Sequence, residues 1–130
     1  MLKNYRSESK NTFDKIQKIL ASHKARQVFF DYEDNGRVKT LGFSLEIKGK
    51  FVGFRLPARV EKVELLISNK DQAYRTAWAN IRDWLDAQMA LIDTEQVKME
   101  EVFLPYAIGR DGKTFFEMVE NNNFLLGDGK

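Results

Sequence analysis

Residues 27–56 read QVFFDYEDNGRVKTLGFSLEIKGKFVGFRL, and this stretch decides the fold. Apolar and polar residues alternate along it, as in strands that bury one face. Two turn sequences, Asn35-Gly36 and Gly49-Lys50, interrupt the alternation. The stretch therefore predicts an antiparallel meander of three strands, near residues 27–33, 38–48 and 51–56.

The two turns also predict a register. Asn-Gly favours a two-residue hairpin loop because type I′ turns need positive φ at both central residues. A loop at Asn35-Gly36 pairs Val28 with Phe43, Phe30 with Leu41 and Tyr32 with Lys39. A loop at Gly49-Lys50 pairs Ile47 with Val52, Leu45 with Phe54 and Phe43 with Leu56. Both loops put the same residues of the middle strand on one face, which a one-residue slip would reverse.

One face of this sheet is apolar, and three strands alone are marginally stable, so helices must cover it. The apolar face carries Val28, Phe30, Leu41, Phe43, Leu45, Ile47, Val52, Phe54 and Leu56. The other face is mostly polar, with two phenyl rings among basic residues. It carries Phe29, Asp31, Val38, Thr40, Gly42, Ser44, Glu46, Lys48, Phe51, Gly53 and Arg55. Phe29 falls opposite Gly42, which its ring can cover.

The rest of the chain reads as helices. Apolar residues at helical spacing predict an N-terminal helix from Asn11 or Thr12 to about Lys24, and a long central helix over 71–93. Shorter helical segments are expected near 60–67, 97–104 and 115–120. The expected fold is therefore α+β, with a three-stranded meander packed against the first and central helices and short C-terminal helices. We expect a mobile basic arm over 1–10, a single domain over 11–120 and a tail over 121–130.

Composition limits the class of protein. The 130 residues are 43% apolar and include no cysteine, which fits one intracellular domain and excludes disulfides and thiolate chemistry. No apolar run approaches the roughly 18 residues of a membrane span, and the N-terminus lacks the apolar core of a secretory signal. We expect a cytoplasmic protein without a membrane partner.

Charge is unevenly distributed. Residues 1–60 hold 13 Lys and Arg against 6 Asp and Glu, whereas residues 61–130 hold 8 against 13. A basic half beside exposed aromatics is typical of a surface that binds nucleic acid. The predicted contacts are Lys3, Arg6, Lys10, Lys15, Lys18, Lys24, Arg26, Phe29, Lys48, Phe51 and Arg55. The alternative is that these charged residues cluster in the sequence by chance and lie on unrelated, solvated faces.

No catalytic or metal-binding pattern is strong, so we expect no cofactor, no metal and no enzyme activity. His23 is the one histidine and fits a role at the end of the first helix. Asp31 followed by Glu46-Ile47-Lys48 matches the D…E-x-K order of PD-(D/E)xK nucleases, whose carboxylates bind Mg²⁺. The predicted register argues against that match, because it places Asp31 and Glu46 about 20 Å apart along the sheet.

Three segments carry a resemblance to known proteins. They are FRLPA at 54–58, AW at 77–78 followed by DWLDAQMAL at 83–91, and VFLPY at 102–106. Over residues 27–120 the chain resembles small uncharacterised proteins of bacteriophages and prophages. The resemblance implies a phage or mobile-element protein acting in the bacterial cytoplasm, in DNA transactions or against a host system.

Three functions follow as hypotheses. The first is a non-enzymatic accessory protein that binds nucleic acid through its basic half and sheet face. The second is an anti-defence inhibitor of a host nucleoprotein enzyme, whose acidic residues imitate a phosphate backbone. Those residues are Asp83, Asp86, Asp93, Glu95, Glu100 and Glu101. The third is a homo-oligomer joined through the tail, at Phe124–Leu126.

Overall fold

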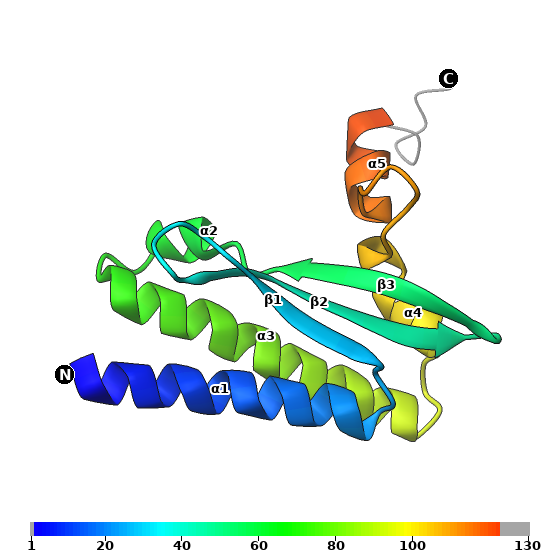
Figure 1. Ribbon diagram of the computed structural model, residues 1–130, viewed down its shortest axis with the longest axis horizontal. Helices are drawn as coiled ribbons and strands as arrows, with labels where there is room; N and C mark the ends of the chain where they lie inside the picture. The colour runs from blue at the N-terminus through cyan, green and yellow to red at the C-terminus, as the bar shows by residue number, and fades with distance from the viewer. Residues whose placement is uncertain (1, 123–130) are drawn as a thin grey trace.

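The computed structural model describes residues 2–122, with side chains from Lys10 to Asn121. It is an α+β fold with one antiparallel sheet in the order β1-β2-β3 (Figure 1). The elements are α1 (Leu2–Ser22), β1 (Gln27–Tyr32), β2 (Val38–Ile47), β3 (Lys50–Pro57), α2 (Val60–Glu64), α3 (Lys70–Asp93), α4 (Met99–Phe103), η1 (Leu104–Tyr106) and α5 (Phe115–Asn122). The predicted meander and both main helices are confirmed.

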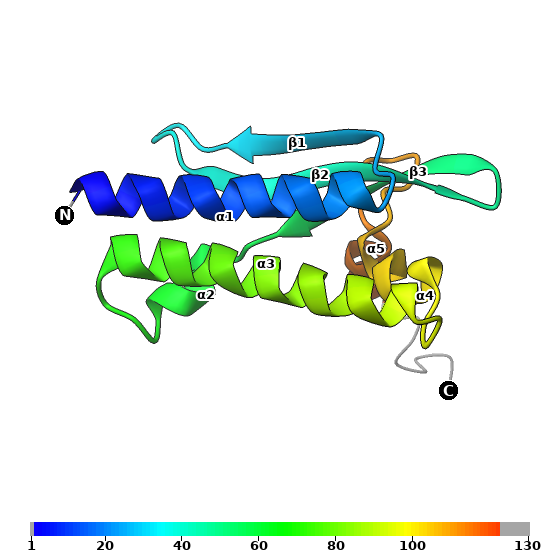
Figure 2. The same cartoon turned by 90° about the horizontal axis from the view of Figure 1, so that it is seen from below.

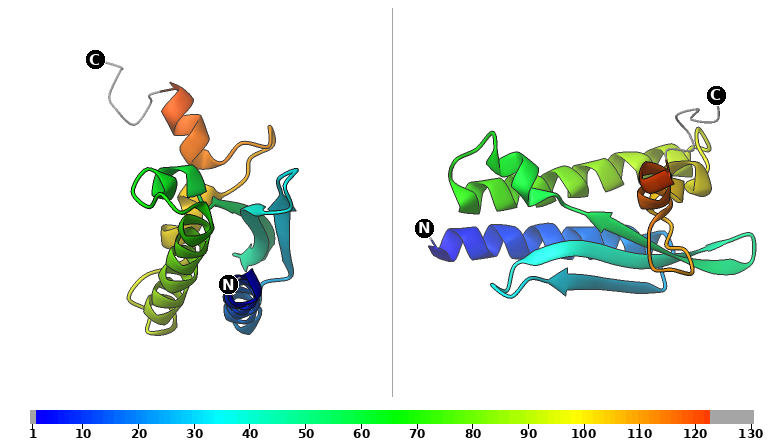
Figure 3. Two further views of the ribbon diagram at one scale, coloured as in Figure 1. Left: turned by 90° about the vertical axis from the view of Figure 1, so that its left-hand side faces the viewer. Right: turned by 90° about the horizontal axis from the view of Figure 1, so that it is seen from above.

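The sheet and the helices form two layers. Helices α1 and α3 lie side by side against one face of the sheet, as Figure 2 and the left view of Figure 3 show. Apolar sheet residues meet them there, so the predicted apolar face is the core face. Trp78 of α3 is 1% exposed at the centre of that core. The ring of Phe13 from α1 lies 5.1 Å from both Phe30 and Trp78.

A second aromatic cluster joins the short C-terminal elements to the sheet. Phe103 of α4 is fully buried, and its ring centroid lies 5.5 Å from Phe43 and 5.8 Å from Trp84. Beyond it, Ala107 forms a β-bridge to Phe54 at the edge of β3. Helix α5 then begins with the predicted capping box, in which the Glu117 N–H donates to Thr114 Oγ1 and the Thr114 N–H donates to Glu117 Oε1.

The first hairpin departs from the predicted register at its tip. The predicted pairing holds from Gln27 to Asp31, but Tyr32 pairs with Val38 and not with Lys39. The Gly36 N–H donates to the Glu33 carbonyl, the Glu33 N–H donates to the Arg37 carbonyl, and Gly36 has φ 85°. These bonds close a loop of three residues where two were expected, and a bulge next to Asp31 restores the register.

This bulge moves Val38 from the polar face, where the sequence placed it, into the core. Val38 is 5% exposed, and both of its backbone polar groups bond to α3. Its N–H donates to Tyr74 Oη at 2.8 Å, and its carbonyl accepts from Trp78 Nε1 at 3.2 Å. Arg37 pairs with Asp71 beside these bonds. The hairpin is therefore fastened to the start of the central helix.

The second hairpin also differs from prediction. Lys48 and Gly49 form its loop, with φ 53° and 83°, so Ile47 pairs with Lys50 and Leu45 with Val52. Both loop residues have the positive φ of a type I′ turn. The pairing is shifted by two residues from the predicted one. Because the side-chain period of a strand is also two, the residues from Leu41 to Ile47 and from Phe51 to Leu56 keep their predicted faces.

Helix α1 begins at Leu2 and not at Asn11 or Thr12, so the expected arm over 1–10 belongs to the helix from Leu2 onward. The helix ends at Ser22, and Lys24 in the turn that follows is left-handed, with φ 69°. The Ala25 N–H donates to the Leu20 carbonyl at 3.0 Å, which closes the last turn. The chain then enters β1 directly.

Candidate nucleic-acid interface

The outer face of the sheet, opposite α1 and α3, carries three of the predicted contacts, which are Phe29, Phe51 and Arg55. Along β2 this face carries small side chains, and Thr40, Gly42 and Ser44 are buried there. The ring of Phe29 lies over Gly42, where it fills the space a Cβ would take. Phe29 is still 48% exposed, so it covers the strand on one side and meets solvent on the other. A hollow lies at each end of this face, and the two differ in the charge of the side chains that line them.

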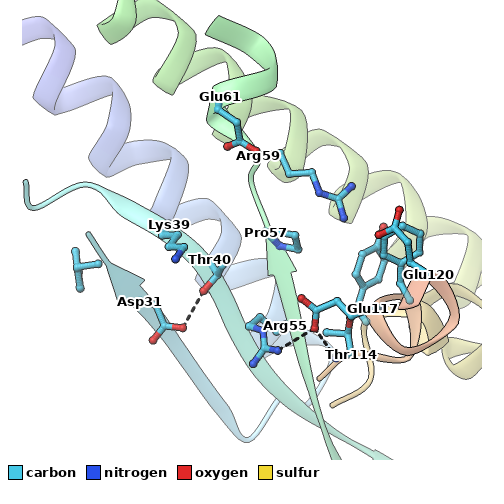
Figure 4. A pocket seen from close by; sticks show the side chains of 13 residues that line it. Asp31, Lys39, Thr40, Arg55, Pro57, Arg59, Glu61, Thr114, Glu117 and Glu120 are labelled. Carbon is cyan, nitrogen blue, oxygen red and sulfur yellow. Dashed lines mark hydrogen bonds and ion pairs between the residues drawn. The ribbon is translucent and has the colours of Figure 1, made fainter. Parts of the chain in front are cut away.

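The larger hollow is a groove of about 670 Å³ between the sheet, α2 and α5 (Figure 4). Arg55, a predicted contact, is engaged here: it donates to the Gly112 carbonyl at 2.6 Å and lies 3.4 Å from Glu117. The Thr114 N–H holds the pKa of Glu117 below its usual value, so this carboxylate stays charged. Three cations face four carboxylates in the lining, which does not suit a polyanion.

The other end carries what we call the Arg26–Phe51 site, made of Lys24, Arg26, Lys48 and Phe51. The Arg26 guanidinium carbon lies 5.2 Å from the centroid of the Phe51 ring, within cation–π range, and Phe51 is 54% exposed. Two hollows, of about 630 and 420 Å³, flank this pair. Among the residues that line them, Glu46 is the one carboxylate.

Topology explains why these residues meet. The turn from α1 to β1 supplies Lys24 and Arg26, and the β2–β3 hairpin supplies Lys48 and Phe51. Both connections lie at the same end of the molecule, on the right in Figure 1. Three positive side chains from segments more than 20 residues apart therefore line one hollow together with an exposed ring.

The remaining predicted contacts do not join this site. Lys10, Lys15 and Lys18 are exposed on α1, in the helical layer. Lys15 lines a separate hollow between α1 and α3. The side chains of Lys3 and Arg6 lie outside the described residues, as does the Phe124–Leu126 segment.

His23 lies beside the site and bridges α1 to α3. Its Nε2 is 3.0 Å from both carboxylate oxygens of Asp93, and its Nδ1 is 2.8 Å from the Ile19 carbonyl. Both ring nitrogens face acceptors, which favours the doubly protonated ring. Burial alone would lower the pKa of His23, but the bonds to Asp93 and Ile19 and the charges of Asp93 and Asp86 outweigh it and raise the pKa above 6.5.

This raised pKa gives a pH dependence. Because the folded state binds the proton more tightly than the unfolded state, the contribution is complete below about pH 6.5 and is lost as pH rises through the folded-state pKa. We expect the free energy of unfolding to be about 0.2–1 kcal/mol larger near pH 6 than near pH 8, since Asp93 is 60% exposed. Urea unfolding at both pH values measures this difference in the free energy of unfolding. An Asp93→Asn variant with the same pH dependence would contradict the assignment.

The nuclease-like carboxylates do not converge. Asp31 lines the groove and accepts a hydrogen bond from Thr40 Oγ1 at 2.8 Å, whereas Glu46 lines the hollow at the opposite end of β2. Among the side chains that the structure describes, from Lys10 to Asn121, no group of three or more histidine or acidic residues gathers in a way that could hold a metal ion.

Comparison with known proteins gives no family: no protein-family model matches the chain, and no curated protein or solved structure matches it significantly. None of the helices in the described part of the chain is both long and apolar enough to cross a membrane. Sequence reasoning missed the groove beside α5. It also missed the hollow above Ser44 and Gly53, although the run of small residues on the polar face was visible.

Proposed function

We propose that the chain is a non-enzymatic protein that binds nucleic acid through the Arg26–Phe51 site. We further propose, on the resemblance of its FRLPA, DWLDAQMAL and VFLPY segments, that it serves a phage or mobile element inside a bacterial cell. The two proposals are separable, because the first rests on geometry and the second on resemblance alone.

The observation that carries the first proposal is that Lys24, Arg26 and Lys48 line one hollow with the exposed ring of Phe51, over which the Arg26 guanidinium lies. Cations that converge on one surface bind successive phosphates, and an exposed aromatic ring offers a face on which a base can stack. The mixed charge of the larger groove lends no comparable support.

Two lysines of the site permit a clean test. Lys24 and Lys48 both have positive φ, which asparagine tolerates better than lysine. The double variant Lys24→Asn/Lys48→Asn therefore removes two charges without straining the backbone, and creates an Asn-Gly turn at residue 48. We expect affinity for a short single-stranded oligonucleotide to fall about tenfold in 0.1 M salt, and the slope of log K against log salt to shrink by about 1.4.

Fluorescence anisotropy with labelled single- and double-stranded oligonucleotides measures both quantities. The matched control is Lys62→Gln/Lys70→Gln, which removes the same charge from exposed positions on α2 and α3. Equal losses in the two double variants would mean that only net charge matters. Absence of any complex near 50 mM salt would remove the proposal.

The inhibitor hypothesis receives less support from the contacts. Of its six acidic residues, Asp83 pairs with Arg82, Asp93 pairs with His23, and Glu101 accepts from the Lys98 N–H. Half of the set is thus engaged in holding local structure, which leaves fewer carboxylates to imitate a row of phosphates.

A further inference from the structure

We propose that the smaller hollow beside Phe51, on the outer face of the sheet, holds one unpaired base of a single-stranded nucleic acid. This inference deepens the proposed function and rests on it, because the Arg26–Phe51 site would hold the phosphates next to that base. It names the substrate class as single-stranded.

The hollow has the size and walls of a base site. Its volume is about 420 Å³, within the usual range for small-ligand sites, and Arg26, Gln27, Ser44, Phe51 and Gly53 line it. One wall is the Phe51 ring, which is braced by the Arg26 guanidinium. An aromatic face beside a cation is the arrangement that stacks bases without regard to their sequence.

The floor of the hollow contains a buried polar group without a partner. Ser44 is 9% exposed, and its hydroxyl makes no hydrogen bond to any residue that the structure describes. Buried hydroxyls are nearly always hydrogen-bonded, so this one points to a ligand. Gln27, at the rim, also lacks a side-chain partner within that part of the chain. A hydroxyl and an amide can each donate and accept, so together they can bond to the edge of any base.

Glycine at position 53 keeps the hollow open. A Cβ at Gly53 would meet only Ile108 Cδ1, at 3.7 Å, which is ordinary contact distance. The space above this residue is therefore unfilled, and a larger side chain would enter it without a clash in the backbone. A base within a duplex has its faces and pairing edge covered, so it could not enter the hollow unless the duplex opened.

The test uses three labelled probes in about 50 mM salt: a 12-nucleotide oligo-dT, an abasic chain of the same length and charge, and a 12-base-pair duplex. Stacking of a base on an aromatic ring changes affinity by roughly 5- to 150-fold. We expect the protein to bind oligo-dT at least about fivefold more tightly than the abasic chain, because the abasic chain offers only phosphates.

The variant Gly53→Val places a branched side chain in the hollow, where it takes space that a base would need. We expect it to bind oligo-dT no better than the abasic chain, while its affinities for the abasic chain and the duplex stay those of the unmodified protein. Gly53→Ala adds only a methyl group. It replaces Gly53→Val in the test if the valine variant unfolds at a lower temperature than the unmodified protein. It should lose part of the preference for oligo-dT.

The outcomes separate the two proposals. Equal affinity of the unmodified protein for oligo-dT and the abasic chain overturns the base site, and so does an unchanged preference in Gly53→Val. Both results leave phosphate binding by Lys24 and Lys48 intact. If the unmodified protein binds none of the three probes, the proposed function itself fails.

Discussion

Trp78→Ala is expected to lower the free energy of unfolding by about 3–5 kcal/mol, the usual cost of removing a large aromatic side chain from a core. Trp78 is 1% exposed, contacts Phe13 and Phe30, and donates a hydrogen bond to the Val38 carbonyl. The substitution leaves a cavity between the two layers and a buried carbonyl without its donor. Because small domains are stable by only about 5–15 kcal/mol, much of the total stability would be lost.

Urea unfolding followed by circular dichroism measures this effect. Asn80→Ala, at an exposed position on the same helix, is the control and should stay within about 0.5 kcal/mol of the unmodified protein. If Trp78→Ala cost less than about 1 kcal/mol, the two layers would not be joined through Trp78.

Phe103→Ala has the second large effect, about 3–5 kcal/mol by the same reasoning, and its effect is local. Phe103 is fully buried between Phe43, Phe54 and Trp84, yet it lies in a helix of five residues. Helices this short do not form alone, so α4 and the elements after it depend on this one anchor. We expect residues 97–122 to open while the sheet, α1 and α3 stay folded.

Hydrogen exchange followed by mass spectrometry distinguishes local from global opening. Protection should fall over 97–122 and persist in β2 and α3. Leu104→Ala is the control, because Leu104 is the next residue and is 51% exposed. Uniform loss of protection across the chain in Phe103→Ala would contradict the anchoring role.

The sequence predicted most of the pairing between the first two strands. Asn35-Gly36 placed Phe29 opposite Gly42 and Phe30 opposite Leu41, as observed, although the loop has three residues and a bulge next to Asp31 compensates for the extra one. The second turn contains glycine at 49 between two lysines, and two different two-residue loops can include it. The chain uses Lys48-Gly49, at the cost of a lysine in the left-handed region, which local sequence does not reveal.

The candidate site was likewise predicted in part from the sequence. Lys24, Arg26, Lys48 and Phe51 were identified from charge and strand face, and topology brings them together. Arg55 satisfied the same criteria, yet its partners Gly112 and Glu117 lie 57 and 62 residues further along the chain. Contacts so distant depend on how the C-terminal helix docks, which no local pattern specifies.

The chain contains a single histidine, and this residue lines the hollow next to Arg26. Its imidazole therefore gives a lone, well-separated signal in a simple proton magnetic-resonance spectrum, without isotope labelling. Its Nε2 bonds to Asp93 of α3, and the ring borders the proposed phosphate contacts. The His23 signal therefore reports both on oligonucleotide binding and on the packing of α1 against α3. Its position during an oligonucleotide titration would register ligand arrival, and its line width would register any loosening between the helices.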